Sequence, residues 1–257
     1  MSEPTNTNTL HAWRGGAVLF DLFGTLVHFA PRVPAVEVAG APWRSAMRWL
    51  QEAAAQELPE VPFDDLLATL MLVTEEIVRR RPPEYREVPS RERFRRALVR
   101  LGVAAAQAPT LAERLSLAHM DHLASLTVLP EGHDAVLRIL AARYRLGLVS
   151  NFDHGATAHR ILAAHGLASF FKATVISEEF GRRKPHPAIF QEALRLLGVG
   201  PADAVFVGDS IDDDVVGAQG ARLPAVWVNA KGASLPADVQ PPLGVITQLT
   251  ELPALLQ

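Results

Sequence analysis

The stretch Phe20–Leu26, FDLFGTL, decides the fold of this 257-residue chain, because it places one carboxylate at the end of an apolar run. Ala17–Phe20 is uniformly apolar, and Gly24 and Thr25 follow closely after the acid, Asp21. A short apolar run that ends in turn residues predicts a buried strand. In an open parallel sheet, functional groups gather just beyond the carboxyl ends of the strands. Asp21 is therefore the first candidate for a reactive residue.

Four further apolar runs bounded by turn residues predict the rest of the sheet: Leu146–Ser150, Ala173–Ser177, Ala204–Gly208 and Ala225–Val228. Helical patterns lie between them, at Asp134–Arg143 and at Pro187–Leu197. Alternating strands and helices predict a parallel sheet with helices on both faces. The expected fold class is therefore α/β, with a doubly wound parallel sheet.

The stretch Pro31–Leu129 differs, because it lacks strand signals and shows helical periodicity broken by proline and glycine. Ser90 is expected to cap one helix, and Thr110–Glu113 fits the capping box of another. We therefore expect a helical insertion after the first strand. The predicted division is a core domain, residues 1–30 and 131–257, and a helical cap domain, residues 31–130.

Composition narrows the classes of protein. Hydrophobic residues make up 49 % of the chain and charged residues 21 %, which is ordinary for a globular protein. The absence of cysteine excludes disulfides, zinc sites built on thiolates and cysteine nucleophiles. No apolar run reaches the roughly 18 to 20 residues that span a bilayer, and Met1–Thr9 lacks the features of a secretory signal. We expect a cytoplasmic protein without a membrane partner.

Charge is concentrated in one segment. Residues 79–100 hold nine arginines and three acids, a net +6, so the remainder of this chain of net charge −3 carries −9. The segment is either a solvated helix face or a surface that attracts an anionic substrate. An acidic remainder and the lack of interleaved aromatic residues argue against nucleic acid as a partner.

Polar residues also follow the other predicted strands: Ser150 and Asn151; Lys184, in GRRKPHPAIF; and Asp209 and Asp214, in VGDSIDDDVVGA. Carboxylates gathered at one edge repel one another unless a cation neutralises them. Carboxylate oxygens are ligands that suit Mg²⁺. A metal and Lys184 together can hold a phosphate or another oxyanion while Asp21 attacks it.

The segments FDLFGTL, LVSN, KPHPAIF and VGDSIDDDVVGA, in this order, resemble the four motifs of the haloacid dehalogenase-like hydrolase superfamily. The helical stretch after the first motif is similar to the cap of one subfamily. This resemblance implies that Asp21 is a nucleophile that forms a covalent aspartyl intermediate, that Ser150 hydrogen-bonds the transferring group and that Lys184 stabilises the intermediate. It also implies a Mg²⁺ site, formed by Asp21, Asp209, Asp214 and the backbone carbonyl of Phe23.

Three further residues are predicted to bind substrate: Thr25, Asn151 and Arg44. Asn151 and the pair Trp43-Arg44 are similar to residues with which the dehalogenases of the superfamily hold carboxylate and halide. The expected partner is a small anionic molecule, and both a monomer and a homodimer remain open.

Phe23 departs from the phosphatase pattern, which has a second aspartate there as general acid and base. Losing such a group typically costs about 10² to 10⁴ in rate. Three functions are compatible: Mg²⁺-dependent hydrolysis of a small phosphorylated or phosphonate metabolite, metal-independent 2-haloacid dehalogenation, and ligand binding without catalysis. The first function requires either a leaving group that departs without a proton or another residue, such as His28, that acts as the acid in place of the missing aspartate. The acidic fourth motif favours this first function, since the dehalogenases resembled here carry neutral residues in that motif.

Overall fold

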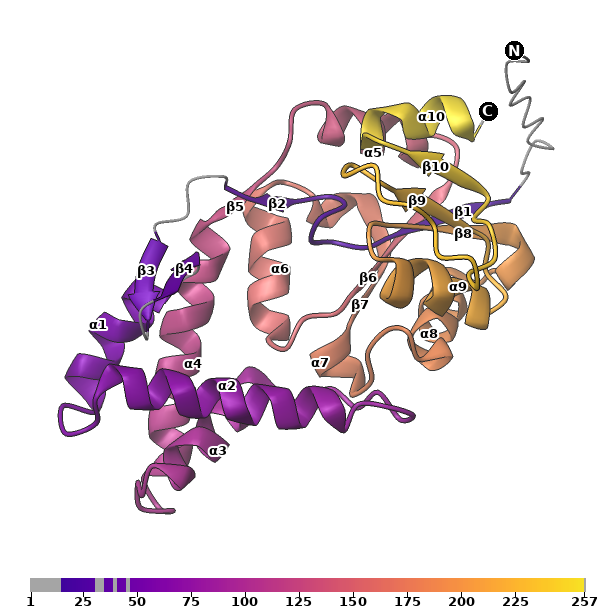
Figure 1. Cartoon of the computed structure of the whole chain (residues 1–257). Helices are drawn as coiled ribbons and strands as arrows, with labels where there is room; N and C mark the ends of the chain where they lie inside the picture. The colour runs from indigo at the N-terminus through magenta and orange to yellow at the C-terminus, as the bar shows by residue number, and fades with distance from the viewer. Residues whose placement is uncertain (1–14, 31–34, 39–40, 45–46, 257) are drawn as a thin grey trace, which may run out of the picture.

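The computed structural model describes residues 15–30, 35–38, 41–44 and 47–256. Its main sheet has six strands, all paired in parallel, in the order β10-β9-β8-β1-β6-β7. The sheet lies at one side of the molecule in Figure 1, with helices on both of its faces. The bounds of its strands are β1 Ala17–Phe20, β6 Arg145–Ser150, β7 Phe171–Ile176, β8 Ala204–Gly208, β9 Ala225–Val228 and β10 Gly244–Ile246.

Alternate residues of β1 face two different layers of helices. Val18 and Phe20 pack in a cluster with α5, α6 and α10, whereas Ala17 and Leu19 pack in a second cluster with α8 and α9. Because both faces are covered, the strands carry apolar residues without alternation. This arrangement confirms the predicted α/β class with a doubly wound parallel sheet. The helices are α5 His133–Ala141, α6 Gly155–Ala164, α8 Pro187–Leu197, α9 Gly217–Gly220 and α10 Leu252–Leu255.

Shorter segments complete this part of the chain. The α-helical turn α7, Ser177–Phe180, follows β7, and a π-helical segment, Ile211–Val216, follows β8. The 3-10 turns are Ala168–Phe170, Pro201–Asp203 and Leu249–Glu251.

Four helices form a separate layer between β1 and β6 in the chain, which we call the helical insert (α1–α4). Its apolar core, which includes Leu66, Phe94 and Leu115, is distinct from the two clusters that cover the sheet. In Figure 1 the insert lies beside the sheet. The connection after α2 contacts α7, where Glu87 accepts from Ser177 Oγ at 2.6 Å. The bounds are α1 Met47–Glu57, α2 Phe63–Arg79, α3 Ser90–Arg100 and α4 Ala108–Ser125. The domain boundaries near residues 30 and 130 stay a prediction.

Strands occur where the sequence predicted only helices. β3 (Ala35–Val38) and β4 (Ala41–Arg44) pair antiparallel, and a strand of four residues is too short to show a clear period in the sequence. The predicted capping box at Thr110–Glu113 was wrong, because α4 already begins at Ala108 with Pro109 in its first turn. Ser90 begins α3 instead of capping it.

Besides the ion pair Arg160–Asp121 between α6 and α4, at 2.6 Å, strand-type pairing joins the helical insert to the rest of the described chain at two places. β2 (His28–Phe29) pairs antiparallel with β5 (Thr127–Val128), where the chain enters and leaves the insert. At the other place, Arg86 and Arg182 form an antiparallel bridge between the α2–α3 connection and the loop before Lys184. In the described ranges, none of the helices has the length and apolar character needed to cross a bilayer.

Candidate active site

A buried ion-paired group lies at the carboxyl end of β1. Lys184 Nζ donates to Asp21 Oδ1 and to Asp214 Oδ1, both at 2.6 Å. The side chains of Lys184 and Asp214 are each 2 % exposed and that of Asp21 is 9 % exposed. Asp21 follows β1, Asp214 lies in the π-helical segment after β8, and Lys184 lies in the loop before α8. The topology thus brings together three residues that are far apart in sequence.

The charges of this group do not balance. Asp21, Asp209 and Asp214 each place a carboxylate oxygen within 4.8 Å of the others, whereas one cation, Lys184, donates to two of them, Asp21 and Asp214. Burial raises the pKa of Asp21 to about 7; the charges of Asp214 and Asp209 add to this rise, and Lys184 opposes it. Burial alone would lower the pKa of Lys184, but Asp21 and Asp214 raise it above its ordinary value. Lys184 therefore stays charged among an excess of carboxylates.

These residues fit a hard divalent cation. The three carboxylates offer oxygen ligands of the kind that Mg²⁺ prefers, and Asp209 retains solvent access while its two neighbours are buried. Asp214 Oδ2 accepts from Ser210 N at 2.9 Å, so this oxygen already has a partner. Asp21, Asp209 and Asp214 are accordingly the side chains that would hold Mg²⁺.

Two glycines allow the carboxylates to approach the backbone. Gly24 has a φ of +87°, and a Cβ atom there would collide with the Asp209 carboxylate. A Cβ atom at Gly208 would collide in the same way with Asp214. Trp227 Nε1 donates to the backbone carbonyl of Asp209 at 3.0 Å and so helps to fix its position. The glycines of FGT and VGD are therefore steric requirements of the site.

A cavity of 180 Å³ opens onto this group. Most of the residues predicted from the sequence as catalytic or metal-binding line it, and Arg183, Ser210 and Asp213 were not among the predicted site residues. A signal for Arg183 and Ser210 was available, since each lies next to a motif residue, but neighbouring position alone does not show which way a side chain points. The lining residues are Asp21, Phe23, Asn151, Arg183, Lys184, Asp209, Ser210, Asp213 and Asp214.

Asn151 contacts the loop that carries Lys184. Its Oδ1 accepts from Lys184 N at 2.7 Å, and its Nδ2 donates to Lys184 O at 3.1 Å and to Asp213 Oδ2 at 3.0 Å. The amide therefore positions Lys184 through the backbone. Its predicted contact with substrate stays a prediction.

Ser150 and Thr25 are both fully buried, and their hydroxyl oxygens make no hydrogen bond to any residue that the structure describes. A buried hydroxyl without a protein partner is uncommon and typical of a group that binds a ligand or water. Neither residue lines the cavity that contains Asp21. Arg44 was also predicted to bind substrate, but its side chain lies outside the described residues.

Phe23 belongs to an apolar wall beside Asp21. Its ring stacks on Phe29 at a centroid distance of 5.5 Å and packs on Phe152 at 4.8 Å. These rings carry no proton to donate. His28 lines a neighbouring cavity of 520 Å³ that shares Asp209 and Ser210 with the first cavity but does not include Asp21. The structure thus gives no direct contact for His28 as a replacement acid.

Comparisons with known proteins agree with this geometry. The model of a family described as haloacid dehalogenase-like hydrolase matches residues 16–222. The chain is 32 % identical to glyceraldehyde 3-phosphate phosphatase of Methanopyrus kandleri, over 82 % of this chain and 83 % of that protein. It is 39 % identical to N-acylneuraminate-9-phosphatase of Rattus norvegicus over 50 % of this chain, and it spans only 52 % of that relative.

The solved structures include a 2-haloacid dehalogenase from Pseudomonas syringae pv. Tomato DC3000. It matches with a TM-score of 0.73 and 29 % identity, over 94 % of this chain and 97 % of that one. Proteins similar to this chain therefore carry phosphatase names and dehalogenase names.

Proposed function

Because the chain belongs to the haloacid dehalogenase-like hydrolases, we propose that it is a Mg²⁺-dependent hydrolase of a small phosphorylated, or phosphonate, metabolite. The observation that carries the proposal is the group of three carboxylates, Asp21, Asp209 and Asp214, around one lysine. A halide leaves without a metal or an acid, so dehalogenation has no use for this excess of negative charge. The phosphatase names of two relatives support the same class of reaction.

The hydrogen bonds of Asp21 suggest which of its oxygens reacts. Lys184 holds Oδ1, so Oδ2 is the oxygen that attacks phosphorus. The new bond between Oδ2 and phosphorus forms as the bond from phosphorus to the organic oxygen breaks, and that oxygen leaves with the electron pair. Water then attacks the phosphorus of the aspartyl phosphate, which releases inorganic phosphate and restores the carboxylate.

The surrounding residues stabilise charge and exclude water. Lys184 offsets the negative charge of the intermediate, and the hydroxyls of Ser150 and Thr25 are proposed to bind the transferring group. Mg²⁺, when held by Asp21, Asp209, Asp214 and the carbonyl of Phe23, supplies positive charge to the phosphoryl oxygens. The helical insert is proposed to act as a cap that limits access of water and selects a small anionic substrate.

Dehalogenation is the second candidate. Phe23 favours it, since a halide leaves without a proton, and so does the 2-haloacid dehalogenase among the similar structures. The two reactions differ in their need for metal and in the ion released.

The experiment that tests the proposal measures phosphate release from acetyl phosphate, p-nitrophenyl phosphate and several sugar phosphates, in Mg²⁺ and in EDTA. We expect release that requires Mg²⁺. Chloride release from 2-chloropropionate, equal in Mg²⁺ and in EDTA, would instead establish the dehalogenase. Release of neither ion would indicate a protein that binds its ligand without catalysis.

Phe23→Asp will raise the turnover of alkyl phosphates by about 10- to 100-fold, because it places a proton donor beside the leaving oxygen. Acetyl and aryl phosphates will gain much less, since their leaving groups need little protonation. Steady-state rates on both classes measure the difference. Phe29→Asp is the matched control, because Phe29 belongs to the same stack but does not line the cavity around Asp21. An equal gain for both classes would contradict this account of Phe23.

Asp209→Asn will weaken Mg²⁺ binding by at least about tenfold, because one full ligand charge is lost. Isothermal titration calorimetry with MgCl₂ measures the affinity directly, without turnover. Asp212→Asn is the control, since Asp212 is exposed in the same loop and is not among the three carboxylates that come together. Unchanged affinity in Asp209→Asn would remove the metal from the proposed site.

A further inference from the structure

The connection between α2 and α3 is fixed against the loop that carries Lys184. Arg183 N donates to Tyr85 O at 2.9 Å, and Glu87 N donates to Gly181 O at 3.1 Å. The side chain of Glu87 is 2 % exposed and accepts from Arg183 Nη1 at 3.0 Å. Residues of the helical insert are therefore held at a defined position beside the cavity.

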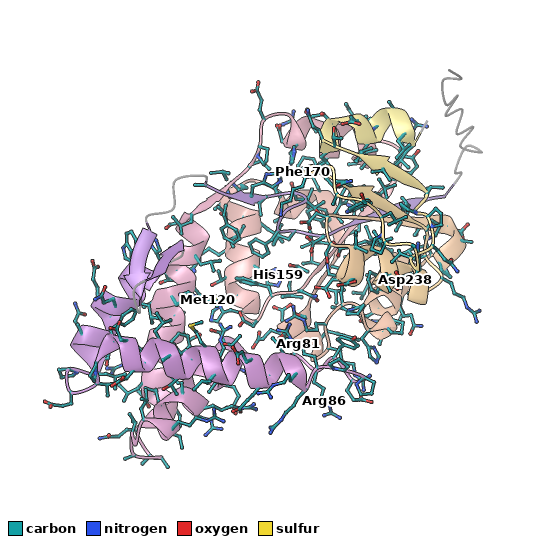
Figure 2. All side chains as sticks on the ribbon, viewed as in Figure 1. Arg81, Arg86, Met120, His159, Phe170 and Asp238 are labelled. Carbon is teal, nitrogen blue, oxygen red and sulfur yellow. The ribbon has the colours of Figure 1, made fainter. Side chains whose placement is uncertain are left out.

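Arg81 lies in this connection, just after α2, and its side chain makes no hydrogen bond to the residues that the structure describes. Its Nε atom is buried and makes no hydrogen bond, and no ion pair joins its guanidinium to the described part of the chain. Figure 2 shows Arg81 on the side of α2 that faces the core and Arg86 farther out. Burial lowers the pKa of Arg81, and the charge of Arg183 lowers it further.

The acids that act on Arg81 are already engaged elsewhere. The charges of Glu87, Asp213 and Asp153 raise the pKa of Arg81 and so oppose the effect of burial. Glu87 bonds to Arg183 and accepts from Ser177 Oγ at 2.6 Å. Asp153 pairs with Arg93 at 2.9 Å, and Asp213 accepts from Asn151. A buried donor without a partner costs free energy, and Arg81 Nε is such a donor, so it is available to a ligand.

Arg183 connects Arg81 with the reacting group. It lines the cavity that contains Asp21, and among described residues its side chain bonds only through Nη1, to Glu87. The cavity is therefore bounded on this side by the Arg183 guanidinium, which keeps free donors. Arg81 does not line this cavity, but its backbone carbonyl accepts from Tyr85 N and Tyr85 O accepts from Arg183 N, so the connection holds Arg81 close to Arg183. Planar guanidinium donors match the two oxygens of a carboxylate.

We infer that Arg81, together with Arg183, binds a carboxylate on the organic part of the substrate, so that the substrate class is a phosphate monoester that also carries a carboxylate. This inference rests on the proposed function. The three arginines here, Arg81, Arg93 and Arg183, face three acids. The subsite thus offers unused hydrogen-bond donors without a large excess of positive charge. Such a subsite suits a singly charged carboxylate better than a second phosphate.

The test compares 3-phosphoglycerate with glycerol 3-phosphate, which has a hydroxymethyl group in place of the carboxylate. We expect Arg81→Gln to lower kcat/KM for 3-phosphoglycerate by about 10- to 100-fold. The value for glycerol 3-phosphate should change less than about twofold. Arg86→Gln is the matched control, because Arg86 is exposed in the same connection. Circular dichroism verifies that each variant folds. Arg81→Lys keeps the charge but loses the planar pair of N–H donors, so its kcat/KM for 3-phosphoglycerate should lie between the values of wild type and Arg81→Gln.

Binding to Asp21→Asn in Mg²⁺, measured by calorimetry, separates this inference from the proposed function. Tighter binding of 3-phosphoglycerate than of glycerol 3-phosphate, lost when Arg81→Gln is added, would support the subsite even if no phosphate is released. Equal binding of the two compounds, or an equal effect of Arg81→Gln on both, would overturn it and leave the phosphatase proposal intact. A preference for fructose 1,6-bisphosphate over fructose 6-phosphate that depends on Arg81 would overturn the assignment to a carboxylate.

Discussion

Replacing Asp21 with asparagine will abolish phosphate release, with kcat/KM falling by roughly 10⁴-fold or more, because an amide cannot serve as the nucleophile. The fold will persist. Asparagine keeps an oxygen that can accept from Lys184 Nζ, as Asp21 Oδ1 does at 2.6 Å. It also removes one negative charge from a buried group that holds two further carboxylates.

Phosphate release in Mg²⁺ and thermal unfolding of the same preparation measure the two halves of this expectation. Asp212→Asn, the same chemical change at an exposed position of the acidic loop, should keep activity near that of wild type. Release that survives in Asp21→Asn would show that another group attacks the substrate.

Replacing Lys184 with methionine will cost about 3–5 kcal/mol of stability, because it leaves Asp21 and Asp214 buried without their cation. For a chain of this length the melting temperature will fall by roughly 10 °C. Turnover will also fall by roughly 10³-fold or more, since the intermediate loses its stabilising charge. Arg195→Gln is the control, because Arg195 is 67 % exposed and pairs with Glu192 at the surface, where such pairs contribute little.

The loss of stability in Lys184→Met will depend on pH in a defined direction. Burial already raises the pKa of Asp21 from 3.8 to about 7 in the folded chain, and loss of Lys184, which opposes this rise, moves the pKa further up. The folded state then binds protons more tightly than the unfolded state, so its stability falls as pH rises. Melting curves should show a small deficit near about pH 5 and a large one near about pH 8. A deficit independent of pH would mean that the carboxylates are not the cause.

The sheet was predictable because its strands are buried on both faces. The bounds of β1, β8 and β9 agree with the predicted ones, since each is an apolar run that turn residues close. β10 was missed, because Gly244–Ile246 is too short to show a period. The antiparallel pair β3–β4 was not predicted, because each strand has only four residues and lies within a stretch of helical periodicity.

The grouping of the three carboxylates was predictable for a topological reason. Residues that follow parallel strands meet at one edge of the sheet, which placed Asp21, Asp209 and Asp214 together without a structure. Arg81 was not identified, because its position depends on how the helical insert packs against the loop before Lys184. Contacts of this kind join segments about a hundred residues apart, and the periodicity of a short stretch of sequence does not predict them.

The second attachment of the helical insert makes its contact with the core sensitive to ionic strength. Its outer ion pairs, Arg182–Glu84 and Arg91–Glu178, each have one side chain that is half exposed or more, so dissolved salt screens them. The inner pair, Arg183–Glu87, is sheltered from salt because Glu87 is almost fully buried. Added salt therefore weakens the two outer ion pairs first, while the inner pair, which lies next to Lys184, keeps most of its strength.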